Sequence, residues 1–368
     1  MNHILFRIAE LEEKFRKVVE RGSQTDRIVG ETQLKTLELF NRRENMNVIP
    51  ITLNLFCGLA IFLYGMRQMS HALKALAGDK IKTVVSNTIT SPFKGALIGA
   101  LFTALVQSSS AITVLVVGLV DAGLMTLLQA TGVIMGANLG TTITTQLITL
   151  NLTDYIPYFL FIGTSFIVIF KTKPLHQIGY FLFSFGILFL GLSLVKTAMS
   201  PIIHSSIFNQ LIFNVQGNLL LCLLLGISIT VLIQSSSAST AILISLVSTG
   251  AISLYTAIPI LFGHEIGTCM TAILSSLSGN KAGKQAALIH FTFNLLGTLL
   301  FLPIIDLLIN FTATFSPTPE RQIANAQLVF NLSTVILFLP FSNLFVKLAE
   351  FIFRDKASVR SHRHFNNL

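Results

Sequence analysis

The sequence predicts an all-α polytopic membrane protein built from two inverted-topology repeats, each with a re-entrant helical hairpin that carries Gln-Ser-Ser-Ser. Three observations predict this fold class: the apolar composition, two apolar stretches interrupted by Gln-Ser-Ser-Ser, and a sequence repeat. Of the 368 residues, 52% are hydrophobic and 11% are charged, and the mean hydropathy is +0.74. Soluble proteins carry about a quarter charged residues, so lipid is the main solvent of this chain.

Seven apolar stretches approach or reach the roughly 20 residues with which a helix crosses a bilayer. Short clusters of Lys and Arg flank several of them, which marks the cytoplasmic side of a membrane protein rather than a nucleic-acid-binding surface. We therefore expect a multi-pass protein of the cell membrane with both termini in the cytoplasm. The predicted spans are Ile51–Met69, Leu124–Leu150, Tyr155–Phe170, Gly179–Met199, Leu254–Leu274, Gln285–Leu308 and Leu328–Phe353.

Polar segments flank this apolar region. Residues 1–47 place apolar side chains at helical spacing between charges, which predicts a cytoplasmic amphipathic helical arm; a regulatory or partner-binding arm is the alternative. Residues 354–368 form a basic tail, expected in the cytoplasm. Between them we assign transmembrane repeat 1 to residues 48–175, repeat 2 to residues 176–310 and a final transmembrane segment to residues 311–353.

Two further apolar regions are interrupted by polar residues. The first is broken by Gln-Ser-Ser-Ser at 107–110, and the second by the same four residues at 234–237. The apolar halves on either side are too short to span a membrane and indicate re-entrant hairpins. Backbone without hydrogen-bond partners is tolerated at membrane depth only inside protein or beside a watery cavity. We therefore expect both runs at hairpin tips that face a cavity.

The two runs belong to a longer internal repeat. An offset of 127 positions aligns not only the runs but also Gly136–Thr142 with Gly263–Cys269, and Thr144 with Thr271. Three predicted spans separate the hairpins, and an odd number would turn the second copy upside down. Inverted repeats with broken helices that meet near the midplane are typical of secondary transporters.

The chemistry of the paired runs suits an anion that travels with a cation. Hydroxyl and amide groups both donate and accept hydrogen bonds, and helix N-termini at the hairpin tips favour an oxyanion. Hydroxyl, amide and backbone carbonyl oxygens suit sodium. The alternative is structural, because Ser and Thr in membrane helices also bond to the preceding turn or join helices together.

Paired Gln-Ser-Ser-Ser runs, each followed about thirty residues later by a Gly-Ala-Asn-x-Gly-Thr-Thr-like segment, resemble the type II sodium/phosphate cotransporter family. The resemblance covers roughly residues 50–350. It implies sodium-dependent symport of inorganic phosphate by alternating access, with one chain as the transport unit, no cofactor and no enzymatic activity. The phosphate ligands that it implies, at the midplane between the tips, are Gln107, Ser108, Ser109, Ser110, Gln234, Ser235, Ser236 and Ser237. The implied sodium ligands are Gln107, Asn138, Thr141, Thr142, Gln234, Glu265, Thr268, Thr271 and Asn294.

One departure from the family pattern is Glu265, which stands where the family commonly has Asn and is the only acidic residue between Asp154 and Asp306. A buried ionisable group in a membrane protein is a functional candidate, so we hypothesise that Glu265 binds sodium or carries a proton. The alternative is a neutral carboxyl that is held by hydrogen bonds or paired with His264.

Other interpretations of the sequence stay open. A phosphate exporter or a passive anion channel would use the same scaffold. His290 and Asn294, four residues apart on one helix face, either join two helices or contribute to an ion site, and Gln327 and Asn331 repeat their spacing. A serine hydrolase is disfavoured because the chain has no Gly-x-Ser-x-Gly motif.

Overall fold

A computed structural model describes residues 48–77, 89–150, 152–277 and 279–353, so the predicted N-terminal arm and basic tail lie outside the described residues. All regular elements in the described part are helical. Five helices or joined helices are long and apolar enough to cross a membrane, and a sixth span arises if one bent helix pair is counted. Five of the predicted spans are thereby confirmed, as Pro50–Leu76, Lys173–Ile203, Leu254–Ser276, Lys281–Ala313 and Pro319–Ile352.

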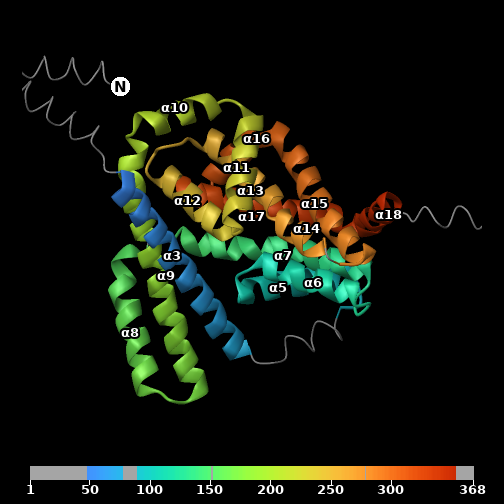
Figure 1. Ribbon diagram of the computed structural model, residues 1–368, viewed down its shortest axis with the longest axis horizontal. Helices are drawn as coiled ribbons and strands as arrows, with labels where there is room; N and C mark the ends of the chain where they lie inside the picture. The colour runs from blue at the N-terminus through green and yellow to red at the C-terminus, as the bar shows by residue number, and fades with distance from the viewer. Residues whose placement is uncertain (1–47, 78–88, 151, 278, 354–368) are drawn as a thin grey trace, which may run out of the picture.

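Three helices form one flank of the molecule (Figure 1). They are α3 (Val48–Ala77), α8 (Ile156–Ile169) and α9 (Lys173–Ile203). Helices α3 and α9 are antiparallel and approach closely through glycines: Gly65 faces the backbone of Leu188, and Gly191 faces the backbone of Phe62. Neither glycine leaves room for a Cβ, so the two backbones touch.

Two short-helix hairpins lie beside this flank. They consist of α5 (Pro92–Val106) with α6 (Ser109–Asp121), and of α11 (Leu219–Ile233) with α12 (Ser236–Ser248). The corresponding helices have the same length and begin 127 positions apart. Each hairpin begins with a side-chain cap, which satisfies one free N–H of the first turn: Ser91 accepts from Lys94 N at 3.4 Å, and Asn218 accepts from Leu221 N at 3.1 Å.

Each hairpin packs against a longer helix. Helix α5 contacts α7 (Leu127–Ile148), and α11 contacts α13 (Leu254–Gly267). The same glycine contact occurs twice, since Gly136 of α7 lies against the Ala96 carbonyl and Gly263 of α13 lies against the Leu223 carbonyl. These four residues also correspond at an offset of 127.

The segment after α7 differs from the prediction of two separate spans, Leu124–Leu150 and Tyr155–Phe170. Helices α7 and α8, connected through a 3-10 turn at Thr153–Tyr155, meet at an angle of 77° and qualify as a span only together. The reason is that α8 has only 14 residues and α7 is rich in Thr and Gly. Three separate spans between the hairpins, from which the inversion was predicted, are therefore not observed.

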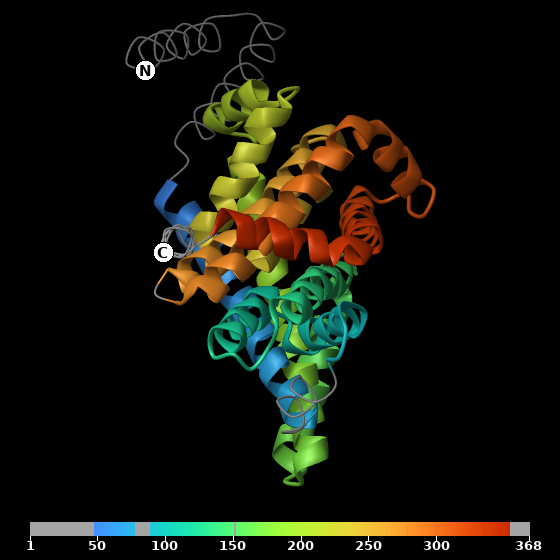
Figure 2. The same ribbon diagram turned by 90° about the vertical axis from the view of Figure 1, so that its right-hand side faces the viewer.

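The remaining helices complete the bundle around the second hairpin. Figure 2 shows α18 lying across the end of this group. Phenyl rings of α13, α15 and α17 join the group, with ring centroids 4.8 Å apart for Phe262 and Phe330 and 5.3 Å apart for Phe301 and Phe330. The bounds are α10 Ser206–Val215, α14 Cys269–Ser276, α15 Lys281–Phe301, α16 Ile305–Ala313, α17 Pro319–Phe338 and α18 Ser342–Ile352, with 3-10 turns at Leu302–Ile304 and Leu339–Phe341.

Candidate functional site

Both hairpins reverse at a glutamine in the left-handed backbone region. Gln107 has φ 55° and ψ 30°, and Gln234 has φ 54° and ψ 27°. The next residue caps the second helix: Ser108 Oγ accepts from Ala111 N at 3.2 Å, and Ser235 Oγ accepts from Ala238 N at 3.3 Å. The Gln-Ser-Ser-Ser sequence thus ends one helix and starts the next within two residues, which leaves the N-termini of α6 and α12 at the tips.

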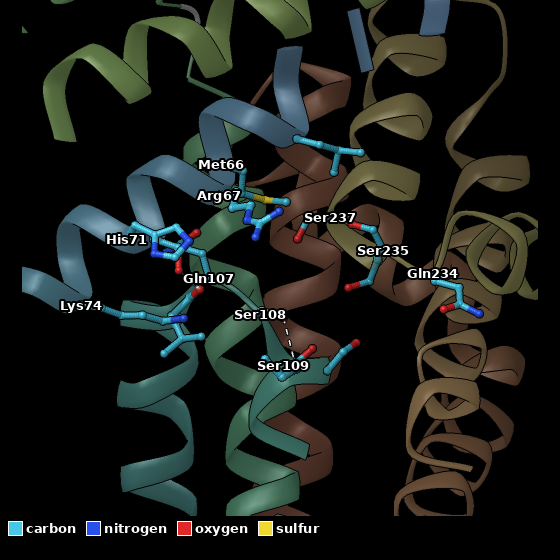
Figure 3. A pocket seen from close by; sticks show the side chains of 16 residues that line it. Met66, Arg67, His71, Lys74, Gln107, Ser108, Ser109, Gln234, Ser235 and Ser237 are labelled. Atoms are coloured by element: carbon cyan, nitrogen blue, oxygen red, sulfur yellow. Dashed lines mark hydrogen bonds between the residues drawn. The ribbon is translucent and has the colours of Figure 1, made fainter. Parts of the chain in front are cut away.

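A cavity of about 500 Å³ lies between the two tips and α3 (Figure 3). All eight side chains that the family resemblance implies as phosphate ligands line this one cavity, so the structure brings the two distant runs together. Ser109 and Ser237 are buried, whereas Gln234 is exposed to the cavity. The eight are Gln107, Ser108, Ser109, Ser110, Gln234, Ser235, Ser236 and Ser237.

The first tip is held by hydrogen bonds that were not predicted from the sequence. Thr144 Oγ1 donates to Gln107 Oε1 at 2.7 Å, and Gln107 Nε2 donates to the Ala104 carbonyl. Ser70 Oγ of α3 donates to the Val106 carbonyl at 2.6 Å. The repeat contained a signal for Thr144, because it aligns with Thr271. Ser70 belongs to none of the motifs described above, so the sequence offered no reason to place it at the first tip.

The second tip has a different environment. A small space adjoining the cavity is lined by Gln234 and Ser236 of this tip, by Ser110 of the first, and by Thr268 and Thr271. Among the described residues, Gln234 has no hydrogen-bond partner for its side chain. Its carboxamide is therefore available to a bound ion.

The predicted threonine ligands bond to their own helices. Thr142 Oγ1 donates to the Leu139 carbonyl at 2.7 Å, and Thr268 Oγ1 donates to the Glu265 carbonyl at 2.7 Å. Thr141 and Thr271 make equivalent bonds to carbonyls four and three residues earlier, at 3.2 and 2.9 Å. Each hydroxyl thereby uses its proton, so its lone pairs remain available as acceptors.

Asn138 and Asn294 lie outside the cavity lining and form a buried network of neutral groups. Asn138 Nδ2 donates to Asn294 Oδ1 at 2.7 Å, and Asn138 Oδ1 lies 3.1 Å from His290 Nε2. Asn294 Nδ2 also lies 3.2 Å from Cys269 Sγ. This network joins α7 of the first half to α15.

Glu265 occupies the position that corresponds to Asn138 and forms a second network. Its Oε1 accepts from Gln327 Nε2 at 2.7 Å and from Asn331 Nδ2 at 3.2 Å, both on α17. Within the described part of the chain, Gln327 Oε1, Asn331 Oδ1 and both ring nitrogens of His264 lack hydrogen-bond partners. His264 is therefore not the hydrogen-bond partner of Glu265, and the Gln327 and Asn331 side chains that bond to Glu265 each keep an amide oxygen without a partner.

Known proteins provide an independent comparison. The model of the Na+/Pi-cotransporter family matches the chain in two consecutive stretches, residues 61–197 and 199–339. The chain is 34% identical over 298 residues to "Uncharacterized protein YqeW" of Bacillus subtilis (strain 168), an alignment that covers 81% of this chain and 97% of that relative.

Two further relatives carry functional names. "Putative inorganic phosphate export protein YjbB" of Escherichia coli O157:H7 is 29% identical over 256 residues, 70% of this chain, and the chain spans about half of that relative, 47% of its length. "Sodium-dependent phosphate transport protein 2B" of Rattus norvegicus is 43% identical over 88 residues, which make up 23% of this chain and 13% of the rat protein. No solved structure matches the chain.

Proposed function

Because this chain belongs to the Na+/Pi-cotransporter family, we propose that it is a sodium-dependent symporter for uptake of inorganic phosphate, which it binds between its two hairpin tips. The observation that carries the proposal is that both Gln-Ser-Ser-Ser runs, 127 positions apart, line one cavity. A transporter for an anion needs such a site inside the membrane, and neutral donors from two hairpins suit a tetrahedral oxyanion.

Each tip offers the anion two kinds of donor. The hydroxyls of Ser109 and Ser236 stand at the first positions of α6 and α12, and the first N–H groups of a helix have no partner within it. The positive ends of both helix dipoles also point to the tips. Phosphate between them would accept hydrogen bonds from both halves of the chain.

Sodium would be held by oxygen atoms around the tips and in the two networks behind them. Around the tips, we assign sodium binding to Gln107 and Gln234 and to the neighbouring Thr268 and Thr271. The assignment of Glu265 is supported by the unpartnered oxygens of Gln327 and Asn331 next to it. Cations bound with phosphate reduce the large cost of removing a charged anion from water. The remaining proposed sodium ligands are Asn138, Thr141, Thr142 and Asn294.

We further propose that the two halves form inverted repeats, at residues 48–175 and 176–310, with residues 311–353 as a final segment. Support comes from α3 and α9: positions 62 and 65 correspond to 188 and 191, and the contact of Gly65 with Leu188 recurs as the contact of Gly191 with Phe62. A contact made twice in this way supports a two-fold relation between the halves. Since α3 and α9 are antiparallel, such an axis would be perpendicular to them and would lie in the membrane plane, as in secondary transporters built from inverted repeats.

Phosphate uptake into proteoliposomes tests the proposal. Radiolabelled phosphate should accumulate under an imposed sodium gradient and not under an equal potassium gradient. Ser109→Ala and Ser236→Ala should each lower uptake by roughly tenfold or more, because each removes a hydrogen bond to a charged ligand. Ser165→Ala is the matched control, since Ser165 bonds to the Phe161 carbonyl within α8, outside the cavity. Full uptake by both tip variants would contradict the assigned site.

A second candidate is phosphate export, which the name of the YjbB relative favours. An exporter oriented with both termini in the cytoplasm would move phosphate out of loaded vesicles, and a passive anion channel would conduct without any sodium gradient. Measuring efflux from phosphate-loaded proteoliposomes with the sodium gradient reversed or removed distinguishes the three activities.

A further inference from the structure

Helix α3 lines the cavity with basic side chains. Arg67, His71 and Lys74 follow one another at spacings of four and three residues, so they share one face of the helix. All three line the same cavity as the two tips, and Figure 3 shows Arg67 and His71 directed into the space beside Ser237 and Gln107. Among the residues that the structure describes, none of the three has a hydrogen-bond or ion-pair partner.

The rule that basic residues mark the cytoplasmic side of a membrane does not explain the basic face of α3. Basic residues that flank a span mark the cytoplasmic side, and the N-terminal arm is expected there as well. However, Arg67 and Lys74 lie toward the C-terminal end of the span Pro50–Leu76, opposite to the end that joins the arm. One crossing helix cannot have both ends on the same side, so the charges of α3 call for another role.

The basic face is also specific to α3. In α9, which corresponds to α3 at an offset of 126, the equivalent positions are Ser193, Thr197 and Ser200. The positive charge is therefore not a feature shared by the two halves. Helix α9 carries Lys196 instead, at the position that corresponds to Ser70, and this lysine lines a different pocket.

The position of α3 relative to the first tip is fixed. Ser70 Oγ donates to the Val106 carbonyl at 2.6 Å, one residue before Gln107. Ser70 lies between Arg67 and His71 in sequence and is itself buried. This bond holds the basic face in register with the hydroxyl groups of the tip, so a ligand bound at the tip would meet both.

We infer that α3 supplies the charged wall of the anion site, with Arg67 donating hydrogen bonds to an oxygen of bound phosphate and Lys74 attracting the anion from the same helix face. This rests on the proposed function. The tips provide only neutral donors and helix ends, whereas a guanidinium adds full charge and a planar pair of donors that matches phosphate. Arg67 is thus a ligand-binding residue that the Gln-Ser-Ser-Ser motif does not include.

The test is the phosphate dependence of transport in proteoliposomes. Arg67→Gln should raise the phosphate KM by roughly tenfold or more, as expected for loss of a charge-assisted hydrogen bond, and should change Vmax much less. Arg67→Lys, which keeps the charge but not the planar fork, should have an intermediate KM. Lys94→Gln is the matched control, because Lys94 bonds to Thr90 at the start of α5 and does not line the cavity.

The outcomes separate this inference from the proposed function. If the wild type transports phosphate and Arg67→Gln keeps its KM within about twofold, the role of α3 is refuted while the function stands. If the wild type transports no phosphate, the function itself fails. Should Arg67→Gln not be recovered as folded protein, Lys74→Gln on the same helix face provides the second measurement. A raised KM in this variant, with Lys94→Gln unchanged, supports the charged wall, and an unchanged KM overturns it.

Discussion

Gln107 and Gln234 share a left-handed backbone conformation, with φ of 55° and 54°, although they lie 127 positions apart. They are the only residues other than glycine with positive φ in the described part of the chain. This conformation costs a non-glycine residue about 1 kcal/mol or more, and glycine would adopt it freely. Because the same strain occurs at the same point of two hairpins, we predict that the carboxamide side chain is needed there.

Two substitutions of Gln234 distinguish the effect of its left-handed backbone conformation from the effect of its side chain. Gln234→Gly should be at least as stable as the wild type, because it relieves the left-handed strain and removes no hydrogen bond seen among the described residues. Gln234→Ala should keep the strain. Both variants should lose sodium-dependent phosphate transport. Thermal unfolding in detergent and uptake in proteoliposomes measure the two effects, and a Gly variant with full transport would show that the side chain is dispensable.

Glu265→Gln should keep the fold, because Gln can still accept hydrogen bonds from Gln327 and Asn331 at the same oxygen. The loss of negative charge should raise the sodium concentration for half-maximal transport by roughly tenfold, which corresponds to about 1.4 kcal/mol. Uptake is measured as a function of sodium concentration and of pH, with exposed Glu350→Gln as the control. Unchanged dependence on both would rule out a role of Glu265 in binding sodium or carrying a proton.

The glycine contacts of α3 and α9 predict a difference between two kinds of Gly→Ala change. Gly65→Ala and Gly191→Ala force a methyl group against the opposing backbone and should each destabilise the protein by about 1–3 kcal/mol. Gly118→Ala in α6 has no atom within 4 Å of the new Cβ and should be neutral or stabilising by up to about 1 kcal/mol. Equal losses of thermal stability in all three would argue against close packing of α3 on α9.

Asp121, at the end of α6, caps the start of α15. Its carboxylate accepts from Asn280 N at 3.1 Å and from Gly283 N at 2.7 Å. Asp121→Asn removes the charge at a helix N-terminus and should lower stability by about 1 kcal/mol. Asp154→Asn, at an exposed site in the 3-10 turn Thr153–Tyr155, is the control and should have little effect. The difference in melting temperature between these two variants measures the cap.

Much of this arrangement could be predicted from the sequence, because the length of an apolar helix and the offset of a repeat can both be measured along the chain. Hydropathy located five spans, and the short apolar halves around 107–110 and 234–237 correspond to the hairpins that the structure contains. The offset of 127 aligns the two Gln-Ser-Ser-Ser runs in the sequence, and in the structure both runs line the same cavity. The functional roles of these residues stay predictions.

The features that the sequence did not predict depend on how helices are oriented relative to one another in space. Hydropathy measures apolar length but not angle, so the 77° bend between α7 and α8 was missed. The same holds for Arg67 and Lys74, because spacing in the sequence does not show which way their face of the helix points. The pairing of Glu265 with α17 was likewise hidden, since its partners lie more than sixty residues further along the chain.

The two buried networks have a consequence for how the halves diverge. Asn138 and Glu265 occupy matching positions, yet one meets a histidine and an asparagine of α15 and the other meets a glutamine and an asparagine of α17. Helix α15 thus completes the polar interior around Asn138, and α17 completes the one around Glu265. The two networks nevertheless meet at Cys269, whose Sγ lies 3.2 Å from Asn294 Nδ2 and 3.7 Å from the Glu265 carbonyl oxygen, so a substitution in one network should also alter the other.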